Sequence, residues 1–212
     1  MLPKQPNPSV LSVVICIAES KNWSKRFSVR VISGYIKGHK LQTARGSTVR
    51  PTADRVKEAM FNILTPPIAG TNVLDLFAGS GALGIEALSR GALSAVFIDC
   101  NLHALSVLRK NLKHCKIVEK STVIQWNIEK SLTCLKGYPH KFDLVFMDPP
   151  YRHNMVTIAI KHLLQCDCMA DSTKIIAEHE PGCRIQLPGG DIRIIDTRRY
   201  GSNQLSFFSY LS

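Results

Sequence analysis

Residues 71–84 read Thr-Asn-Val-Leu-Asp-Leu-Phe-Ala-Gly-Ser-Gly-Ala-Leu-Gly, and this stretch decides the fold. Its first half, 71–77, is an apolar run that predicts a buried strand, and three glycines in G-x-G-x-x-G spacing follow it. A helix-like segment, 85–90, comes next, so the glycines form a loop that lets the backbone approach a ligand at a helix N-terminus. The run 94–99 predicts the next strand and ends at Asp99, where an acid suits the two hydroxyls of a ribose. This order of elements predicts an α/β, doubly wound sheet with a nucleotide-like ligand at its edge.

Asp75 distinguishes between the nucleotide-like ligands that such a loop can bind. It stands just before the glycines, where the pyrophosphate of a dinucleotide would lie, and an unpaired carboxylate there would repel a dianion by several kcal/mol. NAD is therefore disfavoured. S-adenosylmethionine carries an ammonium and a sulfonium instead of phosphates, so we expect Asp75 to bind its amino-acid end, in part through water, and Asp99 to bind its ribose.

A second polar motif, Asp148-Pro149-Pro150-Tyr151, directly follows the apolar run 142–147. The run predicts a buried strand, and the two prolines force the chain into an extended loop at the strand's carboxyl end, where ligands bind in open α/β sheets. One chemistry that such a loop could serve is methylation of an exocyclic amine of a nucleobase. This amine is a poor nucleophile because its lone pair is delocalised into the ring. If the Asp148 carboxylate and the Pro149 carbonyl accept its two N–H groups, the lone pair turns toward a methyl donor, and Tyr151 would stack on the flipped base. A simple strand-terminating turn is the alternative interpretation.

Three motifs together carry a family resemblance: residues 74–84, residues 148–151 and the upstream Arg-Pro-Thr-Ala-Asp-Arg-Val-Lys-Glu of 50–58. With the opening Val-Ile-Ser-Gly of 31–34 they resemble the RsmD family, and the similarity runs from about Val29 to the C-terminus. The resemblance implies a class I methyltransferase that uses S-adenosylmethionine to methylate the exocyclic N2 of a guanine in bacterial 16S ribosomal RNA, as naked rRNA or as the 30S particle. The candidate catalytic residues are then Asp148, Pro149, Pro150 and Tyr151, and the candidate cofactor-binding residues are Asp75, Phe77, Gly79, Gly81, Asp99 and Asn127.

Other functions share the proline loop. DNA adenine-N6 methylation, DNA cytosine-N4 methylation and glutamine methylation of a release factor all use it, although the glutamine enzymes usually carry Asn in place of Asp148. An RNA-binding assembly factor without catalysis is a further alternative, and the intact Asp75, Asp99 and Asp148 argue against it.

Charge and composition favour a polyanionic partner. The 212 residues are 45% apolar, which is enough for one domain with a full core, and the formal net charge is +11. Glycines at 34, 38 and 46 predict a mobile loop whose backbone folds around RNA, although a charge run is usually a solvated face. We expect RNA contacts from Lys37, Lys40, Arg45, Arg50 and Arg55, with His39 and Lys57 in the same basic segment. Arg198 and Arg199 are either a second phosphate contact or simply the basic tip of a hairpin.

The seven cysteines are odd in number and contain no C-x-x-C, so we expect neither a structural zinc site nor a disulfide framework, and a reducing cytosol fits. Cys166 and Cys168, with His162 nearby, are a weak candidate for a metal site. We expect no metal, no membrane attachment, a cytoplasmic location and a monomer.

The remaining periodicity completes the sheet. Thr52 is the predicted cap of a helix that Pro66 and Pro67 end, and Asn101 is the predicted cap of a helix through about Cys115. A final antiparallel hairpin on a mostly parallel sheet of seven strands resembles the class I methyltransferase fold. The other predicted elements are a helix at about 154–166 and strands at 122–127, 174–177, 192–197 and 205–211, the last two forming the hairpin.

Residues 1–28 depart from the family resemblance. Their apolar run, 10–18, resembles a secretory h-region but is too short to span a membrane. Val29 stands where the family starts with methionine, and a GUG start codon misread as internal would explain the extension. We expect residues 1–28 to be a disordered or wrongly assigned extension and 29–212 to be a single methyltransferase domain, in which 29–66 is a basic element covering RNA and cofactor.

Overall fold

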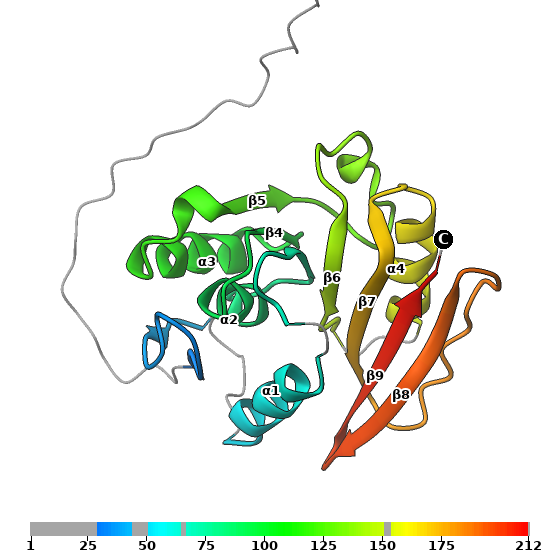
Figure 1. The fold of residues 1–212 in the computed structure, drawn as a ribbon, viewed down its shortest axis with the longest axis horizontal. Coiled ribbons are helices and arrows are strands. Elements are labelled where there is room, and N and C mark those ends of the chain that lie inside the picture. The colour runs from blue at the N-terminus through cyan, green and yellow to red at the C-terminus, as the bar shows by residue number, and fades with distance from the viewer. Residues whose placement is uncertain (1–28, 44–50, 65–66, 151–153, 212) are drawn as a thin grey trace, which may run out of the picture.

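The computed structural model describes residues 29–43, 51–64, 67–150 and 154–211, with side chains from Val56 onward in the first helix. Within these residues seven strands form one sheet in the order β5-β4-β3-β6-β7-β9-β8 (Figure 1). β3 to β7 are parallel and β9 is antiparallel to both of its neighbours, so the predicted mostly parallel sheet with a C-terminal antiparallel hairpin is confirmed. The sheet strands are β3 (Asn72–Leu76), β4 (Ser94–Asp99), β5 (Ser121–Gln125), β6 (Phe142–Met147), β7 (Met169–His179), β8 (Ile192–Tyr200) and β9 (Asn203–Tyr210), and β1 (Val29–Arg30) and β2 (Lys40–Leu41) form a separate hairpin.

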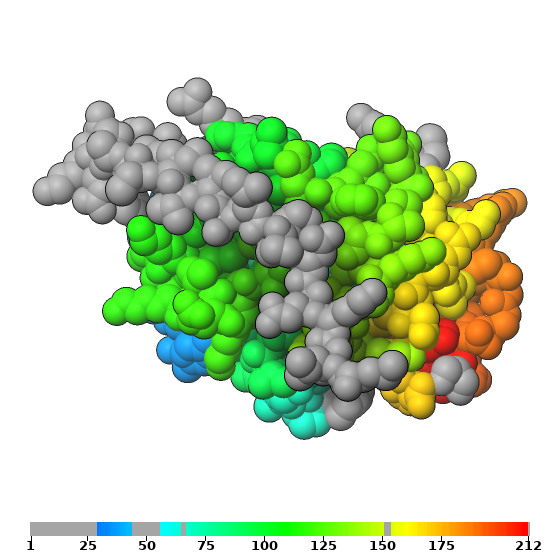
Figure 2. All heavy atoms as spheres, turned by 90° about the horizontal axis from the view of Figure 1, so that it is seen from above, coloured from blue at the N-terminus to red at the C-terminus, as the bar shows by residue number. Residues whose placement is uncertain are grey.

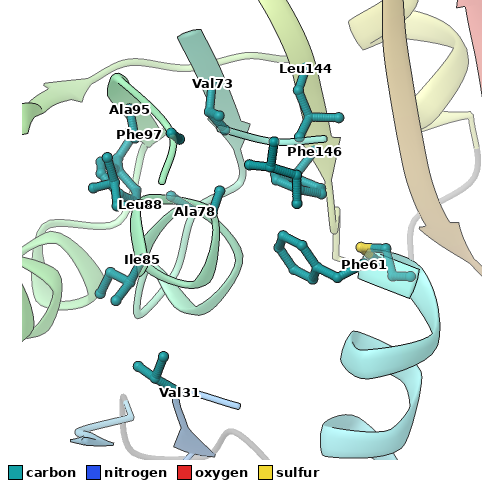
Figure 3. Close-up of a cluster of buried hydrophobic side chains, with 14 of the residues drawn as sticks. Val31, Phe61, Val73, Ala78, Ile85, Leu88, Ala95, Phe97, Leu144 and Phe146 are labelled. Atoms are coloured by element: carbon teal, nitrogen blue, oxygen red, sulfur yellow. The ribbon is translucent and has the colours of Figure 1, made fainter. Parts of the chain in front are cut away.

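Helices cover both faces of the sheet, α1 to α3 on one face and α4 on the other. Successive residues of a strand point to opposite faces. Leu144 and Phe146 of β6 therefore lie in the core under α1 to α3, whereas Val145 and Met147 lie in the core under α4. Figure 3 shows the first core, in which Phe61 of α1 faces Phe146 with ring centroids 5.3 Å apart. The helices are α1 (Pro51–Ile63), α2 (Ala82–Ser89), α3 (Leu102–His114) and α4 (Met155–Leu164), with short 3₁₀ helices η1 (Val118–Lys120) and η2 (Thr133–Leu135).

Two helix starts test the predicted caps. The Asn101 side chain accepts hydrogen bonds from the backbone N–H groups of His103 (2.9 Å) and Ala104 (3.2 Å), so its predicted role as the cap of α3 is confirmed. α1 begins at Pro51, so Thr52 lies within the first turn and the prediction of Thr52 as cap is wrong. The fixed φ of proline suits the first helical position, and its missing N–H has no helical partner there in any case.

The hairpin of β1 and β2 packs on the end of α2. A Cβ at Gly34 would come within 1.8 Å of the backbone oxygen of Ser89, which also accepts the Tyr35 N–H at 2.9 Å. The turn after Gly34 is therefore fixed against the body of the protein. The prediction of a loop that folds freely around RNA is wrong for this part, and Gly46 lies outside the described residues.

The strands at the C-terminal side of the sheet are longer than predicted. β7 begins at Met169 instead of Lys174, because Phe142 pairs with Met169 and the register then shifts before Leu144 pairs with Lys174. β8 and β9 extend into the turn that joins them. Figure 2 shows this hairpin, in orange and red, on the opposite side of the described molecule from the green of α3 and β5.

Candidate active site

The glycine loop after β3 has a backbone that ordinary residues rarely adopt. Phe77, Gly79 and Gly81 have φ of 60°, 54° and 80°, in the left-handed region that glycine enters without steric cost. Gly81 is the N-cap of α2, and a Cβ there would come within 2.3 Å of Leu108 Cδ1 on α3. The positive φ favours glycine at this position, and any side chain there would also have to displace Leu108, so the loop packs closely at the carboxyl edge of the sheet.

Asp75 of β3 is buried among polar groups of this edge. Its Oδ2 accepts the backbone N–H of Gly84 in α2 at 2.9 Å. Burial raises the pKa of Asp75 well above its ordinary value, the Gly84 hydrogen bond opposes this shift, and the charges of Asp148 and Asp99 add to it. Asp75 therefore has one oxygen committed inside the protein and lies in the field of two further acids.

Asp99 ends β4 and connects the segments that follow three neighbouring strands. Its Oδ2 accepts the Gly79 N–H and its Oδ1 accepts the Asn101 N–H, both at 2.8 Å. Its backbone carbonyl accepts the Trp126 N–H at 3.1 Å, which brings the residue after β5 to the same edge. Asn127 comes next and is exposed, two residues beyond the end of β5 rather than within it as predicted. A carboxylate has about four lone-pair sites, so Asp99 keeps acceptor capacity for hydroxyl groups.

The Asp-Pro-Pro loop leaves the sheet next to the glycine loop. Asp148 directly follows β6, whose last residue pairs with the last residue of β3. The Pro149 residue is buried and Pro150 is exposed, whereas Tyr151 lies outside the described residues. Asp148 and Pro149 therefore follow a central strand of the sheet. They lie in the middle of its carboxyl edge, beside the glycine loop.

The electrostatics of Asp148 combine an accessible side chain with a dense protein surrounding. The loss of surrounding water raises the pKa of Asp148 to about 7, and the charge of Glu178 contributes to the shift. Its side chain is nevertheless exposed. Nearby protein atoms and the charge of Glu178 thus both favour the protonated form of the Asp148 carboxyl.

Glu178 is an acid at this edge that the sequence analysis did not predict as a site residue. Met147 of β6 pairs with Ala177 of β7, so the next residues, Asp148 and Glu178, lie at the same level of neighbouring strands. Asn203 of β9 donates a hydrogen bond from Nδ2 to Oε1 of Glu178. Glu178 directly follows an apolar strand segment, as Asp99 and Asp148 also do, and that pattern is the signal by which it could have been found.

Only some of the predicted RNA-binding residues lie within the described parts of the chain, and one basic residue near them, Lys57, has a structural role. Lys57 is buried, its Nζ donates to the Arg30 carbonyl at 2.6 Å, and it lies 3.3 Å from Oε2 of Glu86. Lys57 thus holds the N-terminal hairpin to α2, and its assignment to a phosphate-binding segment is wrong because a sequence does not show burial. Of the residues predicted to bind RNA, Lys37 and Lys40 are exposed. Arg45 and Arg50 lie outside the described residues, and only the backbone of Arg55 is described. Arg198 and Arg199 are exposed on β8, where Arg198 pairs with Asp196 at 2.8 Å.

Two of the three side chains in the weak metal candidate, those of Cys166 and His162, bond to backbone carbonyls. The Cys166 thiol donates to the Leu132 carbonyl at 3.1 Å, and His162 Nδ1 lies 2.9 Å from the Ile128 carbonyl. In the part of the chain that the structure describes, no group of three or more His, Cys, Asp and Glu side chains is placed to hold a metal ion. None of the described helices has the length and apolarity to cross a membrane.

A family model described as "Conserved hypothetical protein 95" matches residues 29–209. The chain belongs to this family. The predicted resemblance to RsmD is confirmed, because relatives of the chain include "Ribosomal RNA small subunit methyltransferase D" of Escherichia coli K12, 40% identical over 159 residues that cover 75% of this chain and 78% of the relative. The protein of the same name from Haemophilus influenzae is 40% identical over 153 residues, covering 72% of this chain and 79% of the relative.

Solved structures of other proteins share the fold of this chain. The structure named "Putative methyltransferase yhhF from Escherichia coli" superposes with a TM-score of 0.76 at 32% identity, covering 87% of this chain and 99% of that one. A structure from Thermus thermophilus superposes with a TM-score of 0.69 at 28% identity, covering 84% of this chain and 98% of that one. The predicted class I methyltransferase fold is confirmed by these likenesses together with the sheet order.

Proposed function

We propose that this protein transfers a methyl group from S-adenosylmethionine to the exocyclic N2 of a guanine in 16S rRNA of the small ribosomal subunit. One observation carries the proposal. Asp148 and the Pro149 carbonyl leave the sheet beside the glycine loop of β3, in a chain whose relatives are named as small-subunit rRNA methyltransferases. Two acceptors therefore lie where an amino group can meet a donor held by the glycine loop.

The charge of the edge tests the fit of the cofactor. Asp75, Asp99 and Asp148 are close enough for the charges of the other two to raise the pKa of Asp75. Three acids at one edge attract an ammonium and a sulfonium and repel a pyrophosphate, so the residues fit S-adenosylmethionine. When bound, S-adenosylmethionine supplies a methyl group on positively charged sulfur. Asp75, Asp99 and the backbone of Gly79 and Gly81 would hold it, with Phe77 and Asn127 beside the adenosine.

The proline loop orients the amine. The Asp148 carboxylate and the Pro149 carbonyl accept the two N–H groups, which directs the nitrogen lone pair away from the base ring. The same oxygens stabilise positive charge that develops on nitrogen only in the transition state. The methylated amine then loses its proton to water. Tyr151, which lies outside the described residues, is proposed to stack on the flipped base.

The partner follows from the charge of the chain. A net charge of +11 favours RNA, and we propose that Lys37, Lys40, Arg45, Arg50 and Arg55 bind phosphates of 16S rRNA, free or within the 30S particle. Residues 29–212 act as a single methyltransferase domain, a monomer in the cytoplasm, where this RNA resides.

The experiment maps N2-methylated guanines in rRNA from a strain that lacks this gene and from the same strain carrying the wild type. One guanine should lose its methyl group and regain it on complementation. Asp148→Ala should fail to restore it, with a methylation rate lowered by about 10² or more and S-adenosylmethionine affinity within a few-fold, since one oriented acceptor of transition-state charge is lost. Asp148→Asn should be milder, because its amide oxygen still accepts.

A matched control is Asp191→Ala, an exposed acid at the start of β8, which should restore methylation fully. Equal rates for Asp148→Ala and wild type on saturating RNA would mean that the loop is only a turn. Methylated adenine, cytosine or glutamine as the product would move the protein to one of the other amino-group methyltransferases.

A further inference from the structure

Glu178 has no role in the chemistry described so far, yet it lies beside the catalytic loop. In the pairing of β6 with β7, Met147 lies opposite Ala177. The next residue of each strand, Asp148 and Glu178, therefore lies at the same level of the sheet. Glu178 is partly accessible. It therefore borders the place where the amino group of a base must lie if Asp148 accepts its N–H.

The side chains of Asp148 and Glu178 also share one face of the sheet. In β6, Leu144 and Phe146 lie in the core under α1 to α3, and Asp148 continues that alternation. In β7, Ile176 lies in the same core, and Glu178 is two residues further on. The two carboxylates thus point to the same side, the side on which Asp75 bonds to α2.

Asn203 fixes the orientation of Glu178. Its Nδ2 donates to Oε1 of Glu178, so Oε2 is the oxygen left for another donor. Asn203 precedes Leu205 by two residues in β9, and Leu205 belongs to the same core, so Asn203 approaches Glu178 along this face. Burial raises the pKa of Glu178 and the Asn203 hydrogen bond lowers it.

Nucleobases differ at the atom next to their amino group. In guanine two ring nitrogens flank the N2 amine: N1 carries a hydrogen and donates, whereas N3 accepts. In adenine and cytosine the ring nitrogen beside the amine carries a lone pair and accepts. A carboxylate that faces this atom therefore attracts guanine and repels the other two, and a buried acceptor facing an acceptor leaves both unsatisfied.

We propose that Glu178 accepts the N1–H of the target guanine and so selects guanine among the bases that carry an amino group, with Asn203 as its positioning residue. The inference rests on the proposed function and adds the group that determines specificity. Asp148 and the Pro149 carbonyl bind the amine that reacts, whereas Glu178 reads the neighbouring ring atom, which does not.

The experiment replaces the target guanine, once located by mapping, with 2-aminopurine in a synthetic RNA. This base keeps the amino group at C2, but its N1 accepts instead of donating. At pH 8.5, which lies above the pKa of about 7 of Asp148, the wild type should methylate the guanine RNA about tenfold to a hundredfold faster than the 2-aminopurine RNA at subsaturating concentration. Equal rates on the two RNAs would overturn the proposal without the use of any variant.

Glu178→Gln then assigns the preference to this residue. Asn203 donates, so it should bind the amide oxygen of the new side chain and direct its NH₂ toward the base, where it donates to N1 of 2-aminopurine and opposes N1–H of guanine. The preference should fall to within about threefold or reverse. Glu180→Gln, the same change at an exposed position two residues further on, should keep the wild-type preference.

The outcomes separate the two proposals. If wild-type product mapping finds no N2-methylguanine, the proposed function fails and this inference fails with it. If guanine is methylated but Glu178→Gln keeps the full preference, only the role of Glu178 is overturned. Asn203→Ala is the second variant: the loss of its donor should reduce the preference severalfold while S-adenosylmethionine affinity and melting temperature stay near the wild type, a pattern that a merely structural role would not give.

Discussion

At the scale of single residues, Asp75 illustrates a conflict between stability and ligand binding. Its carboxyl group is buried, it accepts the Gly84 N–H at 2.9 Å, and two further acids lie near it. Burial raises its pKa well above the ordinary value. A carboxyl group whose pKa is higher in the folded chain than in the unfolded chain binds its proton more tightly when folded, so the folded state loses stability as the pH rises from the unfolded pKa, about 4, to the folded pKa.

Asp75→Asn should therefore raise the melting temperature at pH 8, and the difference from the wild type should shrink toward pH 5. The amide is neutral at every pH, and its oxygen still accepts the Gly84 N–H. S-adenosylmethionine binding should weaken by roughly 1.5 to 3 kcal/mol, because a charge-assisted hydrogen bond to the ammonium is lost. Thermal melts from pH 5 to 8 and calorimetry measure both effects, with Asp191→Asn as the exposed control. A melting-temperature difference that is the same at both pH values would contradict the assignment of a raised pKa.

At the scale of elements, Glu86 holds the N-terminal hairpin to α2. The Glu86 side chain is fully buried and accepts the backbone N–H groups of Ile32 (2.8 Å) and Ser33 (2.9 Å). It also pairs with Lys57 at 3.3 Å and with Arg90 at 2.9 Å. A carboxylate without exposure is tolerated here because two cations and two backbone donors satisfy it.

Glu86→Ala should lower the free energy of unfolding by about 3 to 5 kcal/mol, because it removes the carboxylate 3.3 Å from the buried Lys57 ammonium and the acceptor of two backbone N–H groups. Denaturant unfolding measures the loss. Glu119→Ala, an exposed acid in η1, is the matched control and should change stability by less than about 0.5 kcal/mol. A loss below about 1 kcal/mol for Glu86→Ala would show that water replaces the carboxylate.

The elements that the sequence predicted are those whose signal is local. The apolar run 142–147 followed by two prolines defines β6, and Asn101 with the helical spacing after it defines α3. The burial of Lys57 and the position of Glu178 were not predicted, because each depends on which elements become neighbours. From the sequence alone Lys57 is expected at the surface, because its ion-pair partner Glu86 lies on another helix, α2. Glu178 lies at the site only because β6 pairs with β7.

At the scale of the whole molecule, the net charge of +11 favours the encounter with the proposed RNA substrate. Neutralising Lys40, Arg45 and Arg50 together should weaken RNA binding and flatten its dependence on salt by roughly one unit of slope for each phosphate contact removed. S-adenosylmethionine affinity should hardly change. Filter binding over a series of salt concentrations measures the slope. Neutralising Lys130, Lys136 and Lys161, all exposed on or near η2 and α4, changes the net charge equally and should leave the slope nearly unchanged.

Residues 1–28 lie outside the described residues and before the region that the family model matches, which starts at Val29. Deleting them should cost neither stability nor methylation, since the sequence of this segment has no periodic face to bury. Thermal melts and methylation assays of the truncated chain check this. A large fall in melting temperature would instead mean that the apolar run 10–18 packs on the domain.

The position of β9 has a consequence for the synthesis of the chain. β9 lies between β7 and β8 although it follows both in sequence, and within the described residues β8 pairs with β9 alone. Until residues 203–210 have been translated, β7 presents an open edge and β8 has no partner, and such edges adhere to other chains. Insertion of β9 covers the edge of β7, gives β8 its partner and brings Asn203 to Glu178 in one event. The nascent chain is therefore at its most aggregation-prone immediately before its base-reading edge is complete.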